Sequence, residues 1–153
     1  MSTITPFLWF DQEAEQAMDL YVSIFEDARV ISVTRLPGDG PILTAQFVLA
    51  GQEFIALNGG PGHPFNDSIS FVIHVETQAE IDRLWGRLTA DGGEPGPCGW
   101  LKDRFGLSWQ VVPPILGELL GDADPEKAGR TMQAMLQMSK LDIAALLAAH
   151  DGA

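Results

Sequence analysis

The side chains that most often perform chemistry in proteins are few and scattered in this chain of 153 residues. Its three histidines are His63 in a glycine-rich segment, His74 in an apolar segment, and His150 near the C-terminal end. A metal site needs several His, Cys, Asp or Glu side chains at one place, and no His-x-His, HExxH or CxxC spacing provides them. We therefore expect no metal and no cofactor.

Nucleophilic or acid–base chemistry has weak candidates. Cys98 lies in Gly-Pro-Cys-Gly, where no cationic neighbour favours the thiolate, so we expect it to fill a strand position. Ser70 and His74 are four residues apart and would share one face of a strand, but no third member completes a triad. His74 is thus a candidate general base, and a hydrogen-bonded wall residue is the alternative.

Composition and charge exclude several classes of function. Nine basic and 21 acidic residues give a net charge of -12, which repels nucleic-acid phosphates and anionic membranes. No apolar run approaches the roughly 20 residues that cross a bilayer, and the N-terminus lacks the basic region of a secretory signal. A single cysteine cannot form an internal disulfide. We expect a cytoplasmic protein with no nucleic-acid or membrane partner.

The first half of the chain alternates strands and one helix. Apolar periodicity predicts a strand over Ile4–Phe10 and a helix that Asp11 caps and that runs to about Phe25. Three further strands are predicted over Arg29–Arg35, Ile42–Leu49 and Gln52–Asn58. The glycine-rich stretch NGGPG that follows does not open a helix, so it predicts a turn rather than a phosphate-binding loop.

The same order of elements then restarts. A strand is predicted over Ser68–Val75 and a helix over Thr77–Ala90, which begins with a Thr-x-x-Glu capping box. Two short strands follow in GPCGWLKDRFGLSWQVVP, joined by a turn at Asp103–Gly106. The apolar positions of the two halves agree in type and order, although any two strand–helix units would look alike. We predict an α+β protein built from two βαβββ modules.

Residues 114–153 depart from this repeat and predict helices. Met132, Met135 and Met138 recur at helical spacing. Such a stripe serves either core packing or a subunit interface, and we favour the interface.

These motifs resemble the vicinal oxygen chelate superfamily of glyoxalase, bleomycin-resistance and dioxygenase proteins. The chain is similar to its PhnB-like branch, which often carries a 3-demethylubiquinone-9 3-methyltransferase name. The resemblance rests on ITPFLWFD with the helix EAEQAMDLYVSIF, on FIALNGGP and FNDSISFVI, and on GPCGWLKDRFGLSWQVVP. It covers residues 4 to about 113, and the branch's helical tail extends it to near 148.

The resemblance implies paired βαβββ modules that form a U-shaped mixed sheet around a cleft, usually in a homodimer. Residues 1–113 would then be one domain with modules 1–60 and 67–113, and residues 114–153 a C-terminal helical extension at the dimer contact. Because subunits of this superfamily can exchange modules, two modules of one chain or of two chains could form the cleft.

Catalytic members of the superfamily hold a divalent metal with four side chains. Carried over by position, these fall on Ile4 or Thr5, Ala56, Ser70 and Gln110. Aliphatic side chains cannot coordinate a metal, and Ser and Gln without a carboxylate are poor ligands. The methyltransferase name also lacks support, because no glycine-rich strand-to-helix turn is present to hold a nucleotide-like methyl donor.

The sequence therefore predicts a metal-independent small-molecule binding protein with an aromatic and neutral polar cleft. Its ligand would be hydrophobic and either neutral or cationic, because the protein is acidic and contributes tryptophans, which could instead be core residues. The alternative is a metal-dependent or acid–base enzyme of the lyase, isomerase or dioxygenase type, with a nonstandard site around His74. We expect the cleft to contain Asn58, Ser70, His74, Trp100, Lys102, Trp109 and Gln110.

Overall fold

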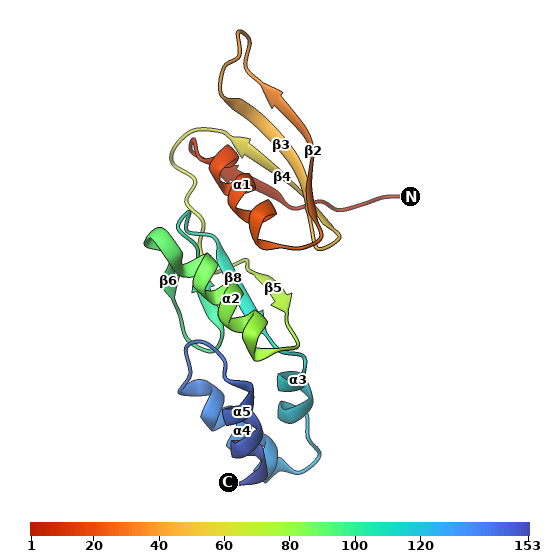
Figure 1. Ribbon diagram of the computed structural model, residues 1–153, viewed down its shortest axis with the longest axis vertical. Coiled ribbons are helices and arrows are strands. Elements are labelled where there is room, and N and C mark those ends of the chain that lie inside the picture. The colour runs from red at the N-terminus through yellow and green to blue at the C-terminus, as the bar shows by residue number, and fades with distance from the viewer. The chain divides into compact units, whose positions relative to one another are not determined.

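The computed structural model describes residues 1–153. The chain folds into two compact units (Figure 1). The first unit is Met1–Pro64 and the second is Phe65–Ala153, so the C-terminal helices belong to the second unit. Each unit contains its own four-stranded sheet.

The first unit is a βαβββ module. Its sheet has the order β1-β4-β3-β2, in which β1 runs parallel to β4 and the other neighbours are antiparallel. A helix, α1, connects the first two strands. The elements are β1 (Phe7–Phe10), α1 (Ala14–Ile24), β2 (Ala28–Arg35), β3 (Ile42–Leu49) and β4 (Gln52–Asn58).

Helix α1 covers one face of this sheet. Because side chains of a strand alternate between the two faces, every second side chain of each strand points towards α1. Phe47 lies in contact with Tyr21 of α1 and stacks on Phe54 of the neighbouring strand, with ring centroids 5.7 Å apart for the latter pair. Leu8 and Ala56 are paired in register on the same covered face, and both are buried. The opposite face carries Phe7 and Trp9 of β1, which are more exposed than Leu8.

The second unit begins with another βαβββ module, which confirms the predicted repetition of elements. The sheet order is β5-β8-β7-β6, again with the first strand parallel to the last and the rest antiparallel. The elements are β5 (Phe71–His74), α2 (Gln78–Thr89), a 3-10 turn η1 (Ala90–Gly92), β6 (Glu94–Pro95), β7 (Trp100–Lys102) and β8 (Ser108–Val112).

Helix α2 begins as the capping box predicts. The hydroxyl of Thr77 accepts a hydrogen bond from the backbone N–H of Glu80, and the buried face of the helix presents Ile81, Leu84 and Leu88. α2 packs on β7 and β8.

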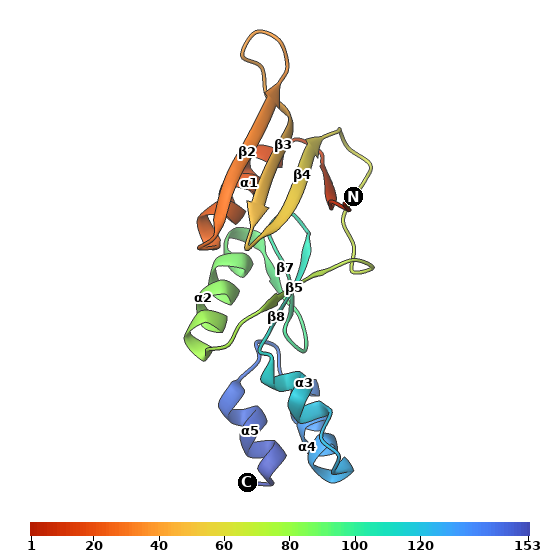
Figure 2. The same ribbon diagram turned by 90° about the vertical axis from the view of Figure 1, so that its right-hand side faces the viewer.

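Three C-terminal helices complete the second unit: α3 (Ile115–Leu120), α4 (Pro125–Leu136) and α5 (Ile143–Asp151) (Figure 2). Their core consists of buried leucines from α3, α5 and the linker before α5. Met135 and Met138 pack against this core, whereas Met132 is 40% exposed. The methionine stripe therefore divides between internal packing and the surface. The core leucines are Leu116, Leu119, Leu141 and Leu146.

All of the helices are too short or too polar to cross a membrane.

Candidate functional site

The second sheet has one face that is not covered by α2, and most of the predicted cleft residues lie on it. The register of β7 and β8 pairs Trp100 with Gln110 and Lys102 with Ser108. Paired residues of a sheet share a face, so these four side chains lie together. β5 adds Val72, paired with Gln110, and two residues further along it His74, which is exposed. We call this surface the open face.

Ser70 and Gln110 are joined on the open face. The Gln110 side-chain amide Nε2 donates a hydrogen bond of 2.9 Å to Ser70 Oγ, and both residues are partly buried. The pair is neutral, and each side chain satisfies part of the other's hydrogen-bonding capacity. These are the positions on the fifth and eighth strands to which the resemblance assigned metal ligands.

Asp67 organises the edge of the open face. Its Oδ1 accepts a hydrogen bond of 2.8 Å from Ser108 Oγ and lies 3.7 Å from Lys102 Nζ. The Lys102 and Asp67 side chains are 42% and 66% exposed, so solvent screens this ion pair and it contributes little to stability. The ion pair instead orients the Lys102 side chain towards Asp67.

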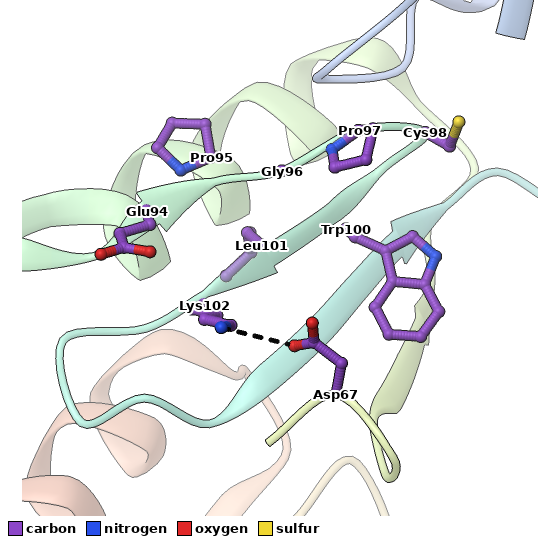
Figure 3. Close-up of a pocket in the computed structure, with 9 residues that line it drawn as sticks. All are labelled: Asp67, Glu94, Pro95, Gly96, Pro97, Cys98, Trp100, Leu101 and Lys102. Carbon is purple, nitrogen blue, oxygen red and sulfur yellow. Dashed lines mark ion pairs between the residues drawn. The ribbon is translucent and has the colours of Figure 1, made fainter. Parts of the chain in front are cut away.

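A pocket of about 480 Å³ lies beside the open face, along strands β6 and β7 (Figure 3). In the close-up, Asp67 reaches towards Lys102 from one side, and the β6 residues and the following turn form the other side. The lining combines apolar and aromatic side chains with two carboxylates and one lysine. It consists of Asp67, Glu94, Pro95, Gly96, Pro97, Cys98, Trp100, Leu101 and Lys102.

The turn Gly96–Gly99 forms one wall of the pocket. Gly96 N–H donates to Trp100 O at 2.8 Å and Trp100 N–H donates to Pro97 O at 3.0 Å, which closes the turn. Cys98 has a positive φ of 57°, a conformation that non-glycine residues rarely adopt. The prediction that Cys98 fills a regular strand position is therefore wrong, because the residue lies in a strained turn between β6 and β7.

Trp109 does not belong to the pocket, which corrects its place in the predicted cleft. It is 3% exposed, pairs with Leu101 on the face that α2 covers, and contacts the ring of Phe71. Its indole Nε1 donates a hydrogen bond of 2.9 Å to the buried carboxylate of Asp103. Trp109 is a core residue, and of the two tryptophans in this hairpin only Trp100 lines the pocket.

Asn58 is also a structural residue rather than a wall of a cleft. Its Oδ1 accepts the backbone N–H of Ala14 at 2.8 Å, and its Nδ2 donates to Ile42 O at 2.9 Å. The Ala14 N–H is one of the free donors at the start of α1, so Asn58 caps that helix from a distant strand. The prediction that Asp11 caps this helix is wrong, because Glu13 occupies the N-cap position and its side chain makes no capping hydrogen bond.

The glycine-rich segment after β4 encloses the indole of Trp9. Trp9 Nε1 donates to Gly60 O at 3.0 Å, and the ring of His63 lies 4.4 Å from the indole centroid. A Cβ on Gly59 would approach Trp9 Cε2 to 2.3 Å, so only glycine fits. The segment is a strand-exit turn, as predicted, and its glycines allow the chain to pass over an aromatic ring.

The residues do not fit a glyoxalase-type metal site. Ala56 lies under α1 and is fully buried, while its neighbours on the other face of β4, Ile55 and Leu57, are aliphatic. Ser70 and Gln110 are hydrogen-bonded to each other. No three side chains of the His, Cys, Asp and Glu types gather in the structure in a way that would hold a metal ion.

Sequence reasoning missed the acidic and proline residues of the pocket. Asp67, Glu94, Pro95 and Pro97 gave no catalytic or metal-binding spacing. A usable signal existed in the stretch EPGPCGW, where prolines and glycines interrupt the expected strand before Trp100. Such an interruption beside a tryptophan is typical of a turn at the rim of a sheet.

Comparison with known proteins gives the family. The family model described as 3-demethylubiquinone-9 3-methyltransferase matches residues 2–112. A PhnB protein from Bacillus cereus, with the same description, has a TM-score of 0.66 and 31% sequence identity. The alignment covers 73% of this chain and 99% of that one. No protein with curated annotation matches the chain.

Two less similar structures share the fold. A glyoxylase/bleomycin resistance protein/dioxygenase domain from Frankia has 18% identity and a TM-score of 0.50, over 74% of this chain and 92% of that one. The fosfomycin resistance protein FosX from Mesorhizobium loti has 14% identity and a TM-score of 0.59, over 79% and 98%. The chain therefore belongs to the PhnB-like family described as 3-demethylubiquinone-9 3-methyltransferase, and it has the α+β fold of glyoxalase/bleomycin-resistance proteins.

Proposed function

We propose that this protein binds a small organic molecule in the pocket beside the open face, without a metal ion. The observation that carries the proposal is the lining of the pocket: Trp100 and Lys102 meet Asp67 and Glu94 around a volume of about 480 Å³. Ligand sites of proteins usually have 300–1,000 Å³, mostly apolar walls and a few polar groups.

The chemistry of the lining favours a hydrophobic ligand that is neutral or cationic. Trp100 and two prolines provide apolar contact, and the face of an indole attracts cations. Two carboxylates face one lysine, and Lys102 already lies near Asp67. The net charge of -12 adds to this preference.

The side chains at the positions that correspond to metal ligands support the proposed metal independence. The positions that correspond to metal ligands carry an aliphatic side chain on β4 and a neutral hydrogen-bonded pair on β5 and β8. Metal analysis of protein purified without chelator tests this part. A stoichiometric divalent ion would contradict it and favour the alternative, a metal-dependent enzyme.

An acid–base enzyme is the other alternative, and His74 is its candidate base. His74 is exposed on the same face as Gln110 but does not line the pocket. We do not adopt the methyltransferase description, because neither four-stranded mixed sheet resembles the parallel sheets that hold nucleotide-like cofactors.

A dye-binding experiment tests the binding proposal. The neutral dye Nile red, the cationic dye ethidium and the anionic dye 8-anilinonaphthalene-1-sulfonate are titrated into the protein while tryptophan and dye fluorescence are recorded. We expect binding of the first two to exceed binding of the third. Trp100→Phe should weaken binding by about tenfold, and Trp9→Phe in the first unit is the matched control. Absence of binding by all three dyes, or equal effects of the two substitutions, would contradict the proposal.

We further propose a homodimer in the cytoplasm. Met132 and Leu136 are 40% and 51% exposed, and they are four residues apart on α4, so they share one side of that helix. An apolar pair of this kind supports a subunit contact at the C-terminal extension. Light scattering of the purified chain tests the dimer, and Leu136→Glu should shift it towards the monomer. The free Cys98 is compatible with a reducing compartment.

A further inference from the structure

The linker between α4 and α5 contacts the pocket wall directly. Cys98 N–H donates to Met138 O and Gly99 N–H donates to Ser139 O, both at 2.8 Å. In return, Ser139 Oγ donates to Gly96 O at 2.5 Å. Three hydrogen bonds therefore join two consecutive linker residues to the turn Gly96–Gly99, although some 40 residues separate them in the sequence.

The side chain of Leu141 in the linker also packs against the turn, at Gly99. Leu141 is fully buried, and a Cβ on Gly99 would lie 2.9 Å from its Cδ1 and 3.0 Å from Val111 O. Gly99 also has a positive φ of 84°. A glycine is required at this position for both reasons, because the linker leucine and strand β8 approach the turn too closely for any side chain.

Helix α2 holds the other side of the linker. The Gln78 side chain donates from Nε2 to Leu141 O at 3.0 Å and accepts the Ile143 N–H on Oε1 at 2.9 Å. Lys140 Nζ lies 2.8 Å from Asp82 Oδ1 on the next turn of α2. The linker is thus fixed between a helix and the pocket wall, with Gln78 satisfying both a backbone carbonyl and a backbone N–H.

This linker lies outside the part of the chain that the family model matches, which ends at residue 112. The Bacillus cereus protein aligns over 99% of its own length but only 73% of this chain, so about a quarter of this chain has no counterpart there. The contact to the turn is therefore made by a segment outside the region that the family model matches.

We propose that the C-terminal extension positions the wall of the ligand pocket, with Ser139 and Gln78 as the positioning residues. The linker residues Met138–Leu141 hold the turn Gly96–Gly99 in its strained conformation, and this fixes Cys98 and Pro97 at the pocket rim. The extension thereby sets the pocket's shape and its affinity for ligand. The effect on affinity rests on the proposed binding function, whereas the effect on the turn does not.

The experiment measures the turn and the binding separately. The turn is followed in ligand-free protein by the rate at which Cys98, the only cysteine, reacts with 5,5′-dithiobis(2-nitrobenzoic acid). Binding is followed with Nile red. The variants are Ser139→Ala, Gln78→Ala and the conservative Ser139→Thr, which keeps a hydroxyl. Ser23→Ala is the matched control, because its Oγ also donates to a backbone carbonyl, that of Leu20 in the first unit.

We expect Ser139→Ala and Gln78→Ala each to increase the reaction rate of Cys98 by about three- to tenfold, which is the effect of losing one or two hydrogen bonds on a local opening. Nile red affinity should fall by a similar factor. Ser139→Thr should restore both values, and Ser23→Ala should change neither. Circular dichroism melting ensures that rates are compared in folded protein.

The outcomes separate the two proposals. If the native protein binds no dye but the Cys98 rates change as expected, the proposed function is contradicted while the positioning of the turn is supported. If dye binds and neither the Cys98 rate nor the affinity responds to Ser139→Ala and Gln78→Ala, the positioning role is overturned. Faster Cys98 reaction with unchanged affinity would overturn the claim that the extension sets binding.

Discussion

Trp109 and Asp103 form a buried pair in which the indole Nε1 donates a hydrogen bond of 2.9 Å to the carboxylate. Both residues are almost fully buried, at 3% and 2% exposure. The other carboxylate oxygen accepts the backbone N–H groups of Phe105 and Leu107 at 2.9 and 3.1 Å. One side chain thus fixes the turn between β7 and β8 and anchors the tryptophan beneath the open face.

Removal of this carboxylate should destabilise the second unit. Asp103→Ala leaves the indole N–H and two backbone N–H groups without their acceptor, and we expect the free energy of unfolding to fall by about 2–4 kcal/mol. Urea denaturation followed by tryptophan fluorescence measures the change. Asp19→Asn, on the exposed side of α1, is the control and should be nearly neutral. Equal stabilities of the two variants would show that Asp103 is not an anchor.

Substitution of Gly59 should have a different effect from substitution of a helical glycine. Gly59→Ala places a Cβ 2.3 Å from Trp9 Cε2, so the indole must move, and we expect a loss of about 1–3 kcal/mol. Gly86→Ala, on α2, meets no atom within 4 Å and should stabilise the protein by about 0.5–1 kcal/mol. Thermal melts of both variants test the contrast, and a stabilising Gly59→Ala would contradict it.

The stability of the C-terminal helices should depend on pH through Asp122. The backbone N–H of Asp124 and then the His150 side chain hydrogen-bond to its carboxylate, and both hold the pKa of Asp122 below its ordinary value of 3.8. Because the folded pKa is lowered, the ionised carboxylate contributes its full stabilisation above pH 3.8 and loses it as pH falls through the lower, folded value.

Asp122→Asn isolates this contribution. We expect the variant to unfold more readily than the native protein at neutral pH, and the difference should shrink as the pH falls below 3.8. Chemical denaturation at a series of pH values, followed by circular dichroism, measures the difference. A gap of constant size across the whole acid range would rule out the carboxylate as its source.

Glu94 should determine which charge the pocket prefers. It pairs in register with Lys102 across β6 and β7 and lines the pocket. Glu94→Gln removes a negative charge while keeping the shape, so ethidium should bind about two- to fivefold more weakly and Nile red should be unaffected. The ethidium effect should diminish at high salt. An equal loss for both dyes would indicate a change of shape instead.

The sequence predicted most elements of both modules because their strands and helices have clear hydrophobic periods, but it missed the two-residue strand β6 (Glu94–Pro95), which is too short to show one. The expected strand over Ser68–Val75 was too long at its start, since β5 begins only at Phe71. The helix for which Asp11 was the predicted cap starts only at Ala14, whose N–H is capped by Asn58. This cap comes from a distant strand, and such tertiary contacts leave no local signal.

The site was predictable only in part, because the pairing register of two strands decides which side chains lie on the same face of the sheet. Trp100 and Trp109 both lie in the same predicted hairpin, but the register pairs Trp109 with Leu101 and Trp100 with Gln110. The two tryptophans therefore face opposite sides of the sheet. The turn at Asp103–Gly106 sets this register, through contacts of a buried carboxylate that the sequence pattern does not reveal.

The bond between Ser70 and Gln110 has a consequence for how this site could change over time. Each partner shields the other, so replacing one alone leaves a stranded polar group on the open face. A glutamate at position 110 would face the hydroxyl of Ser70 and would place a negative charge where the structure has a neutral hydrogen-bonded pair. We therefore expect residues 70 and 110 to be exchanged together rather than singly.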